Sequence, residues 1–178
     1  MKNVLIISTS LRPNSNSEAL GREFARGARE AGHHAEQLTL RGKDIRFCAG
    51  CLACQSLGRC VIRDDTQEIT EKMHDADVIV FATPIYYYEM AGQMKTLLDR
   101  ANWLYSSDYR FGDIYLLTSA AEDDPETPQG AEHGLRGWIA CFERARLAGT
   151  VFAGGVNDAG EIAGHMALQK AYEMGKNI

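Results

Sequence analysis

Four of the chain's five cysteines fall within a segment of thirteen residues: Cys48, Cys51, Cys54 and Cys60. In a reducing compartment such clustering favours metal ligation or redox chemistry over structural disulfides. The remaining cysteine, Cys141, lies in an apolar pattern of helical spacing, so we expect it to be a small core residue. The cysteine segment is therefore the first candidate for chemistry.

The polar segment between residues 8 and 17 has the composition of an anion site. It combines serine, threonine and asparagine side chains with one cation, Arg12, and leads into a predicted helix. Helix N-termini attract anions, and a single cation suits a monophosphate better than a triphosphate. A capped helix explains the same residues, because Ser15 and Glu18 fit a capping box, and both interpretations can hold together. The glycine-rich motifs of nucleotide-hydrolysing and dinucleotide-binding loops are absent.

A third candidate segment, residues 83–95, contains Pro84 followed closely by Tyr86, Tyr87 and Tyr88. Pro84 is expected to end the preceding strand. A flat, mostly apolar ring system needs an aromatic or aliphatic wall and exposed backbone N–H groups, and this segment offers both. An interface patch is the alternative interpretation, because aromatic residues are enriched at interfaces.

Short apolar runs alternate with amphipathic stretches, which is the pattern of a parallel sheet covered by helices. Runs that are apolar on both faces belong to central strands. The predicted strands are residues 4–7, 35–40, 78–81, 114–117 and 151–153, of which 35–40 alternates like an edge strand. They predict an α/β fold with a doubly wound five-stranded parallel sheet of order 2-1-3-4-5. Ligands of such sheets bind at the carboxyl ends of the strands.

Five helices are expected to cover this sheet. Apolar residues at helical spacing predict helices over residues 20–28, 94–104, 135–142 and 163–174. A shorter helix is expected to begin near Asp65, because Asp65 and Glu68 resemble a capping pair.

Size and composition limit the possible functions. The chain has 178 residues, 45% of them hydrophobic, and a formal net charge of −5. We expect one domain, residues 1–178, with a cysteine-rich loop at 47–61. The sequence has no basic cluster of the kind that would indicate a nucleic-acid partner. No apolar run approaches the roughly 20 residues that are needed to cross a bilayer. The first residues do not resemble a signal peptide, so a cytoplasmic protein is expected.

The chain resembles the NADPH-dependent FMN reductase group of flavodoxin-like proteins, and most closely its iron–sulfur flavoprotein branch. The resemblance covers residues 1 to about 105 well and the remainder only as a pattern of strand and helix. It is carried, in order, by Ser10-x-Arg12-x-x-x-Asn16-Ser17, by Cys48-x-x-Cys51-x-x-Cys54 with Cys60 and Val61-Ile62-Arg63-Asp64-Asp65, by Ala76-Asp77 leading into Thr83-Pro84-Ile85-Tyr86, and by Gly92-Gln93-Met94-Lys95 with Asp99-Arg100.

The resemblance implies a site for FMN built from three loops. The residues implied to hold the phosphate are Ser10, Arg12, Asn16 and Ser17; those implied to line the ring are Pro84, Ile85, Tyr86 and Tyr87, with Thr118, Ser119 and Ala120 on its other side. No side chain is assigned a catalytic role, because FMN carries the chemistry. The chain departs from the usual phosphate loop at Leu11, where proline is common, and at Ser15, where glycine is common.

The resemblance also implies that Cys48, Cys51, Cys54 and Cys60 hold a 4Fe-4S cluster. The spacing C-x-x-C-x-x-C is that of ferredoxin ligands, and Cys60 could supply the fourth thiolate. A structural zinc site is the competing interpretation, and four free thiols without metal are the third.

The implied function is that of an FMN-dependent oxidoreductase. NAD(P)H, bound transiently, would reduce FMN, which would then reduce a quinone, a flavin or another small acceptor. The alternative is an electron carrier that passes electrons from ferredoxin through a 4Fe-4S cluster to FMN, and a non-redox binding module is the third hypothesis. The resemblance to this family also implies that the protein assembles as a homodimer or a homotetramer.

Overall fold

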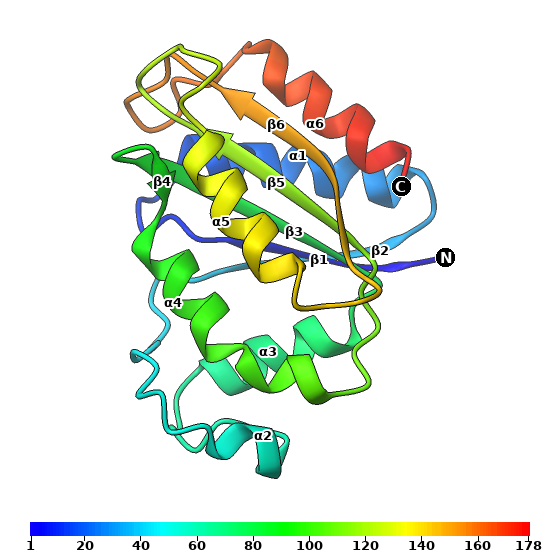
Figure 1. Cartoon of the computed structure of the whole chain (residues 1–178). Helices are drawn as coiled ribbons and strands as arrows, with labels where there is room; N and C mark the ends of the chain where they lie inside the picture. Colours follow the sequence, from blue (N-terminus) through cyan, green and yellow to red (C-terminus); the bar gives the residue numbers. More distant parts are fainter.

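The computed structural model describes all 178 residues and has a parallel β-sheet at its centre (Figure 1). The strands are β1 Asn3–Ser8, β2 His34–Thr39, β3 Val78–Tyr86, β5 Asp113–Ser119 and β6 Arg146–Ala153, and the two-residue β4, Glu89–Met90, pairs antiparallel with the end of β3. The five parallel strands run in the order β2-β1-β3-β5-β6. The predicted order of the parallel strands is confirmed, and β4 is the addition.

Helices cover both faces of the sheet (Figure 1). They are α1 Asn16–Glu30, α2 Ala53–Leu57, α3 Thr66–Asp75, α4 Gly92–Arg100, α5 Gln129–Ile139 and α6 Met166–Lys176, with a 3₁₀ helix, η1, at Asn102–Ser106. α1 and α6 lie on one face, whereas α3, α4 and α5 lie on the other. α2 lies at the end of the molecule away from α6. None of these helices has the length and apolar character needed to cross a membrane.

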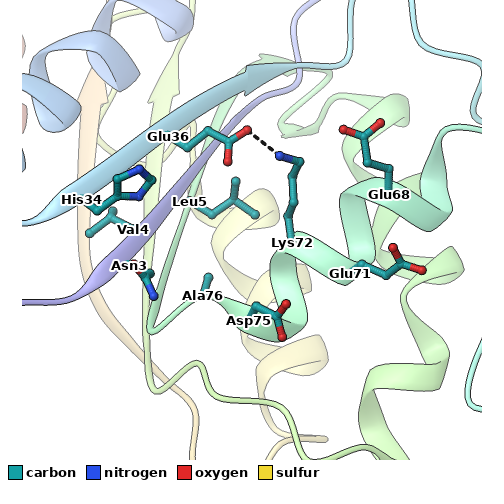
Figure 2. Close-up of a pocket in the computed structure, with 10 residues that line it drawn as sticks. All are labelled: Asn3, Val4, Leu5, His34, Glu36, Glu68, Glu71, Lys72, Asp75 and Ala76. Atoms are coloured by element: carbon teal, nitrogen blue, oxygen red, sulfur yellow. Dashed lines mark hydrogen bonds and ion pairs between the residues drawn. The ribbon is translucent and has the colours of Figure 1, made fainter.

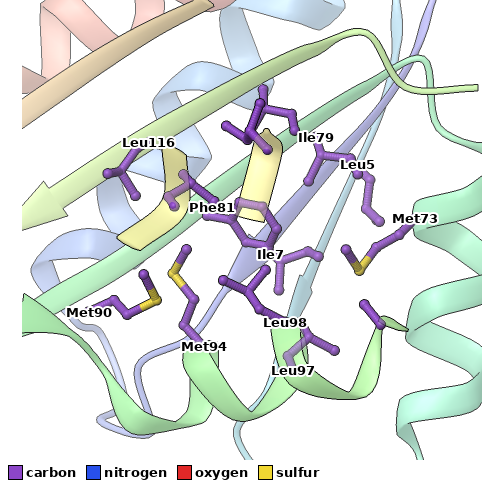
Figure 3. Close-up of a cluster of buried hydrophobic side chains, with 14 of the residues drawn as sticks. Leu5, Ile7, Met73, Ile79, Phe81, Met90, Met94, Leu97, Leu98 and Leu116 are labelled. Atoms are coloured by element: carbon purple, nitrogen blue, oxygen red, sulfur yellow. The ribbon is translucent and has the colours of Figure 1, made fainter. Parts of the chain in front are cut away.

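The central strands bury side chains on both faces. Along β3, Ile79 and Phe81 belong to the cluster beneath α3, α4 and α5, and Val78 and Val80 belong to the cluster beneath α1 and α6. Figure 3 shows Phe81 of the first cluster among side chains that come from α3, α4 and the neighbouring strands. This alternation follows from the two-residue period of a strand, and it explains why the runs are apolar throughout.

Two glycines allow α1 and α6 to pack backbone against backbone. A Cβ atom on Gly27 would lie 2.1 Å from the carbonyl oxygen of Tyr172, and one on Gly175 would lie 2.1 Å from that of Phe24. Either contact is far inside van der Waals distance, so a side chain at these positions would force the helices apart.

α6 begins three residues later than predicted, and its first residue, Met166, is 70% exposed.

The prediction that Pro84 ends its strand is wrong, because β3 continues to Tyr86. Thr9 donates its backbone N–H to the carbonyl of Ala82, at 2.9 Å, so the backbone of Ala82 faces β1. The backbone of Pro84, two residues further along β3, faces the same side. Because β1 ends at Ser8, no strand lies opposite the proline nitrogen and no ladder hydrogen bond is lost there.

Two further local predictions are wrong. Cys141 is exposed, because α5 ends at Ile139 and the apolar spacing continues past the helix. The predicted cap of α3 by Asp65 is also wrong. The side chain that accepts a backbone N–H of the first turn of α3 is that of Asp64, whose Oδ1 accepts the N–H of Thr66 at 3.1 Å. The carboxylate of Asp65 instead accepts the backbone N–H of Asp44.

Candidate functional site: an FMN pocket and a cysteine segment

A cavity of about 150 Å³ lies at the carboxyl edge of the sheet, where the loops after β1, β3 and β5 meet. Its lining residues are Ser10, Arg12, Ser15, Asn16, Pro84, Ile85, Tyr86, Ser119, Ala120, Ala121, Val156 and Asn157. The strand register places Pro84 beside Ser119 across β3 and β5. The structure therefore brings eight of the eleven residues predicted for FMN into one cavity.

The loop of residues 8–17, predicted to bind the phosphate and called the phosphate loop below, contains a helix cap. Ser15 is extended (φ −65°, ψ 151°), and its Oγ accepts the N–H of Glu18 at 3.2 Å. Half of the predicted capping box is formed, because the Glu18 carboxylate turns away and pairs with Arg41 at 3.4 Å. The positive φ in this loop belongs to Asn14 (52°). A serine therefore replaces the usual glycine at position 15 without backbone strain.

A strap of residues 156–162 meets the phosphate loop. Arg12 donates from Nη1 to the carbonyl of Asn157. Asn16 donates to the carbonyl of Asp158 at 3.0 Å, and its Oδ1 accepts the N–H of Ile162 at 3.2 Å. The sequence analysis missed this strap. Its only local signal is a polar, glycine-flanked turn.

Three of the predicted FMN residues lie outside the cavity lining. Ser17 is fully buried in the first turn of α1, and its hydroxyl has no hydrogen-bond partner. Thr118 donates to the carbonyl of Val151 at 3.3 Å, behind the loop. Tyr87 is fully exposed. Their proposed contacts with FMN stay predictions.

The tyrosine turn after β3 is held from two sides. Tyr87 and Tyr88 both have positive φ values, 48° and 64°. A Cβ atom on Gly130 of α5 would lie 2.2 Å from the carbonyl oxygen of Tyr88, so α5 supports the turn closely. A hydrogen bond with Glu122 raises the pKa of Tyr88 and links the turn to the loop after β5. These contacts fix the two loops predicted to hold the ring.

The four clustered cysteines line a second cavity, of about 250 Å³, together with Arg100 and Asn102. All four are free thiols. The side-chain amide of Asn102 donates to Cys54 Sγ at 3.3 Å, and the backbone N–H of Gly50 donates to Cys48 Sγ at 3.4 Å. No three cysteine, histidine, aspartate or glutamate side chains anywhere in the structure converge as ligands of a single metal ion.

The family model for NADPH-dependent FMN reductases matches residues 2–158. The chain belongs to this family. Similar curated relatives are iron–sulfur flavoproteins. The one from Methanocaldococcus jannaschii is 39% identical over 98 residues, which are 55% of this chain and 51% of that protein. The one from Methanosarcina thermophila is 36% identical over 95 residues, which are 53% and 50%. The chain thus spans about half the length of the curated relatives it matches.

Solved structures with this fold include a quinone oxidoreductase and an azoreductase. An NAD(P)H:quinone oxidoreductase from Methanothermobacter marburgensis has a TM-score of 0.73 at 18% identity. The match covers 99% of this chain and 98% of that protein. An azoreductase from Bacillus anthracis has a TM-score of 0.72 at 17% identity, with both chains fully covered. At such identities the likeness shows the fold alone: the family's flavodoxin-like sheet.

The carboxyl-edge cavity suits the phosphate group of the cofactor named by the family. FMN carries one phosphate, and the loop offers one guanidinium, the N-terminus of α1 and the hydroxyl of Ser10. Two buried hydroxyls of the adjoining segment, those of Thr9 and Ser17, lack hydrogen-bond partners within the protein. Buried polar groups are normally satisfied, and neither residue lines the cavity.

The cysteine cavity offers the donor set of a 4Fe-4S cluster. The four irons of such a cluster each take one thiolate, and four thiols line this cavity, two of them already accepting N–H donors. A structural zinc site uses the same four thiolates.

Another cavity, of about 480 Å³, lies at the amino ends of β1 and β2, on the edge opposite the FMN pocket (Figure 2). Its polar side chains are mostly acidic, and Lys72 pairs with Glu36 at 2.7 Å. Hydrogen bonding to Glu36 raises the pKa of Lys72. The pair is satisfied within the protein.

Proposed function

We propose that the chain is an FMN-dependent oxidoreductase that uses NAD(P)H to reduce a quinone, a flavin or another small acceptor. The observation that supports this most strongly is the meeting of Arg12, Pro84 and Ser119, from three separate loops, around one cavity at the carboxyl edge of the sheet. The family match and the quinone- and azo-reductase folds of similar structures support the same class of reaction.

The residues of this cavity bind and orient rather than react. When bound, FMN would supply the hydride and single-electron chemistry at its ring. Arg12 and the first turn of α1 would neutralise the phosphate, and Pro84, Ile85 and Tyr86 would form the wall against the ring. Arg12 donates to the Asn157 carbonyl in the free protein, so phosphate binding exchanges a neutral acceptor for an anionic one. A charge-assisted hydrogen bond is the stronger of the two.

A direct test is anaerobic reduction of the reconstituted protein by NAD(P)H. The flavin absorbance should bleach and then recover when a quinone is added. The matched variants are Arg12→Ala and Arg22→Ala, since Arg22 is an exposed arginine on α1 whose nearest carboxylate lies 4.0 Å away. Only Arg12→Ala should weaken the bound flavin. Failure of NADH and NADPH alike to bleach bound FMN would reject the reductase assignment.

We infer a second candidate function, that of an iron–sulfur flavoprotein electron carrier. A 4Fe-4S cluster on the four clustered cysteines would receive electrons from ferredoxin and deliver them to FMN. The shared cysteine cavity and the names of the curated relatives support it. Iron and sulfide assays after anaerobic reconstitution test it, with Cys51→Ser expected to lose the cluster. Cys141→Ser, at an exposed cysteine outside the cavity, is the control.

We further propose that residues 1–178 form one domain that works in the cytoplasm as a homodimer or homotetramer. Both hydrophobic clusters share the single sheet, and five free thiols suit a reducing compartment. The exposed Tyr86, Tyr87 and Tyr88, which are 50%, 100% and 58% exposed, offer an aromatic surface for a second copy. Light scattering of the purified protein would measure the oligomeric state, and a monomer at all concentrations would contradict it.

A further inference from the structure

Arg100, the last residue of α4, has a fully enclosed side chain paired with an equally enclosed carboxylate. Its Nη1 lies 2.6 Å from Asp64 Oδ2, and its Nη2 lies 3.0 Å from Asp64 Oδ1. Both side chains are 0% exposed. The pair is therefore a bidentate fork, which is the strong form of this interaction.

The same guanidinium binds the backbone on both sides of the cysteine segment. Nη1 donates to the carbonyl of Arg46 at 2.6 Å, and Nη2 donates to the carbonyl of Ile62 at 3.2 Å. Arg46 precedes the first clustered cysteine by two residues, and Ile62 follows the last by two. The intervening helix, α2, buries none of its own residues. Arg100 thus joins the two ends of a segment that has no core of its own, and it does so beside hydrogen bonds between residues 44–46 and 64–65.

The fifth N–H group of the guanidinium, on Nε, is buried and has no partner. Arg100 lines the same cavity as the four cysteines. Burial lowers the pKa of Arg100, but hydrogen bonding to Asp64 outweighs it and raises the value. An unsatisfied buried donor is costly. The cavity is lined by two other acceptor-bearing side chains, Asp99, which pairs with Lys95, and Asn102, which bonds Cys54, and by the four cysteine sulfurs.

We propose that Arg100 is a positioning residue for a sulfur-ligated centre in the cysteine cavity: its Nη groups hold the segment closed, and its Nε–H donates to a sulfur of that centre. This inference rests on the cluster proposed above as the second candidate function. Arginine is required because lysine has neither the planar fork nor an Nε–H beside it. The fixed positive charge also stabilises a centre that has gained an electron, so the reduction potential is higher with Arg100 than without it.

The closing role is tested on the metal-free protein. In Arg100→Lys, which keeps the charge opposite Asp64, hydrogen exchange over residues 46–64 and alkylation of the clustered cysteines should each be at least tenfold faster than in the wild type. Arg136→Lys, at an exposed arginine of α5, should change neither rate. Retained FMN binding shows that the variant is folded. Unchanged exchange and alkylation in Arg100→Lys would overturn the closing role.

The sulfur contact is tested after anaerobic reconstitution with iron and sulfide. A potentiometric titration followed by electron paramagnetic resonance should give a more negative cluster potential in Arg100→Gln than in the wild type. Arg100→Lys should bind the cluster but show an altered resonance spectrum. If Arg100→Gln fails to bind FMN, and so is not folded, Arg100→Lys is the only variant on which the contact is judged. An unchanged potential and spectrum would overturn the Nε–H contact. A wild-type protein that takes up no iron would overturn that contact and the cluster together, while the metal-free exchange would still decide the closing role.

Discussion

The FMN pocket and the cysteine segment are built by opposite means. The pocket lies at the ends of β1, β3 and β5, where the register of paired strands fixes its walls. The cysteine segment has only the five-residue α2, which buries nothing, and its two ends are joined by the buried Arg100–Asp64 pair and by hydrogen bonds between residues 44–46 and 64–65. Loss of one side chain should therefore weaken the pocket by one contact, whereas loss of the Arg100–Asp64 pair should loosen the cysteine segment as a whole.

The largest effect is expected from Asp64→Ala. It leaves the Arg100 guanidinium buried without its counter-ion, and breaking a buried pair in this way costs about 3–5 kcal/mol. The free energy of unfolding from urea titration should fall by that amount, and FMN affinity in dilute buffer should stay within about twofold. Asp44→Ala is the control, because this carboxylate is 67% exposed and lies 3.7 Å from Arg46. Equal effects of the two variants would contradict the role given to the buried pair.

The next largest effect is expected in the pocket, from Arg12→Ala. Removal of a charged hydrogen-bond donor to the phosphate costs about 1.5–3 kcal/mol, which raises the Kd for FMN roughly 10- to 150-fold. Quenching of FMN fluorescence measures it. Alkylation of the clustered cysteines should not change, because the two regions are built separately. A faster alkylation rate in this variant would show that they are coupled.

Acid should release the cysteine segment at a defined pH. Burial raises the pKa of Asp64, but hydrogen bonds from Arg100, Arg46 and Thr66 outweigh it and lower the value from 3.8 to about 2. The contribution of this carboxylate to the free energy of unfolding is therefore fully present above about pH 4 and is lost as the pH falls through about 2. This contribution amounts to about 2 kcal/mol.

The comparison variant for this acid transition is Asp64→Asn, which should lose that part of the pH dependence of unfolding. Glu161, beside the pocket, has a pKa lowered by the backbone N–H groups of Asp158 and Asn157, so acid also loosens the strap. Glu161→Gln should leave the acid release of the cysteines unchanged. A cysteine release that follows Glu161 rather than Asp64 would contradict the assignment.

The smallest effect is expected from Ser17→Ala. The hydroxyl has no partner in the free protein, so its removal should not lower the free energy of unfolding. If it donates to the phosphate, FMN affinity should fall by about 1 kcal/mol, or roughly fivefold. Ser56→Ala, at an exposed serine of α2, is the control. Unchanged FMN affinity would remove Ser17 from the proposed phosphate site.

The sheet could be predicted from the sequence because its strands are apolar on both faces and its helices are amphipathic. The approximate place of the pocket followed, since the carboxyl ends of such strands meet at one edge. The strap could not be predicted, because Arg12 and Asn157 are 145 residues apart and meet through a backbone carbonyl. Cys141 was misplaced because apolar spacing continues beyond the end of α5.

The cysteine segment shows the same limit. Its four cysteines stand out by their spacing, and Asp64 and Arg100 both lie in the motifs that carry the resemblance, but nothing in the sequence pairs them across 36 residues. The local pattern predicts Asp65 as the capping residue of α3, whereas Asp64 accepts the backbone N–H of Thr66 in its first turn. Local patterns reveal residue types and periods, whereas contacts between distant loops depend on the folded sheet.

The central claim is that the loops after β1, β3 and β5 form a preformed site for FMN. The most direct measurement is titration of the flavin-free protein with FMN, followed by fluorescence quenching. We predict saturable binding of one FMN per chain, weakened by Arg12→Ala and unaffected by Arg22→Ala. A protein that stays colourless with excess FMN, or that binds it equally well in both variants, would contradict the account.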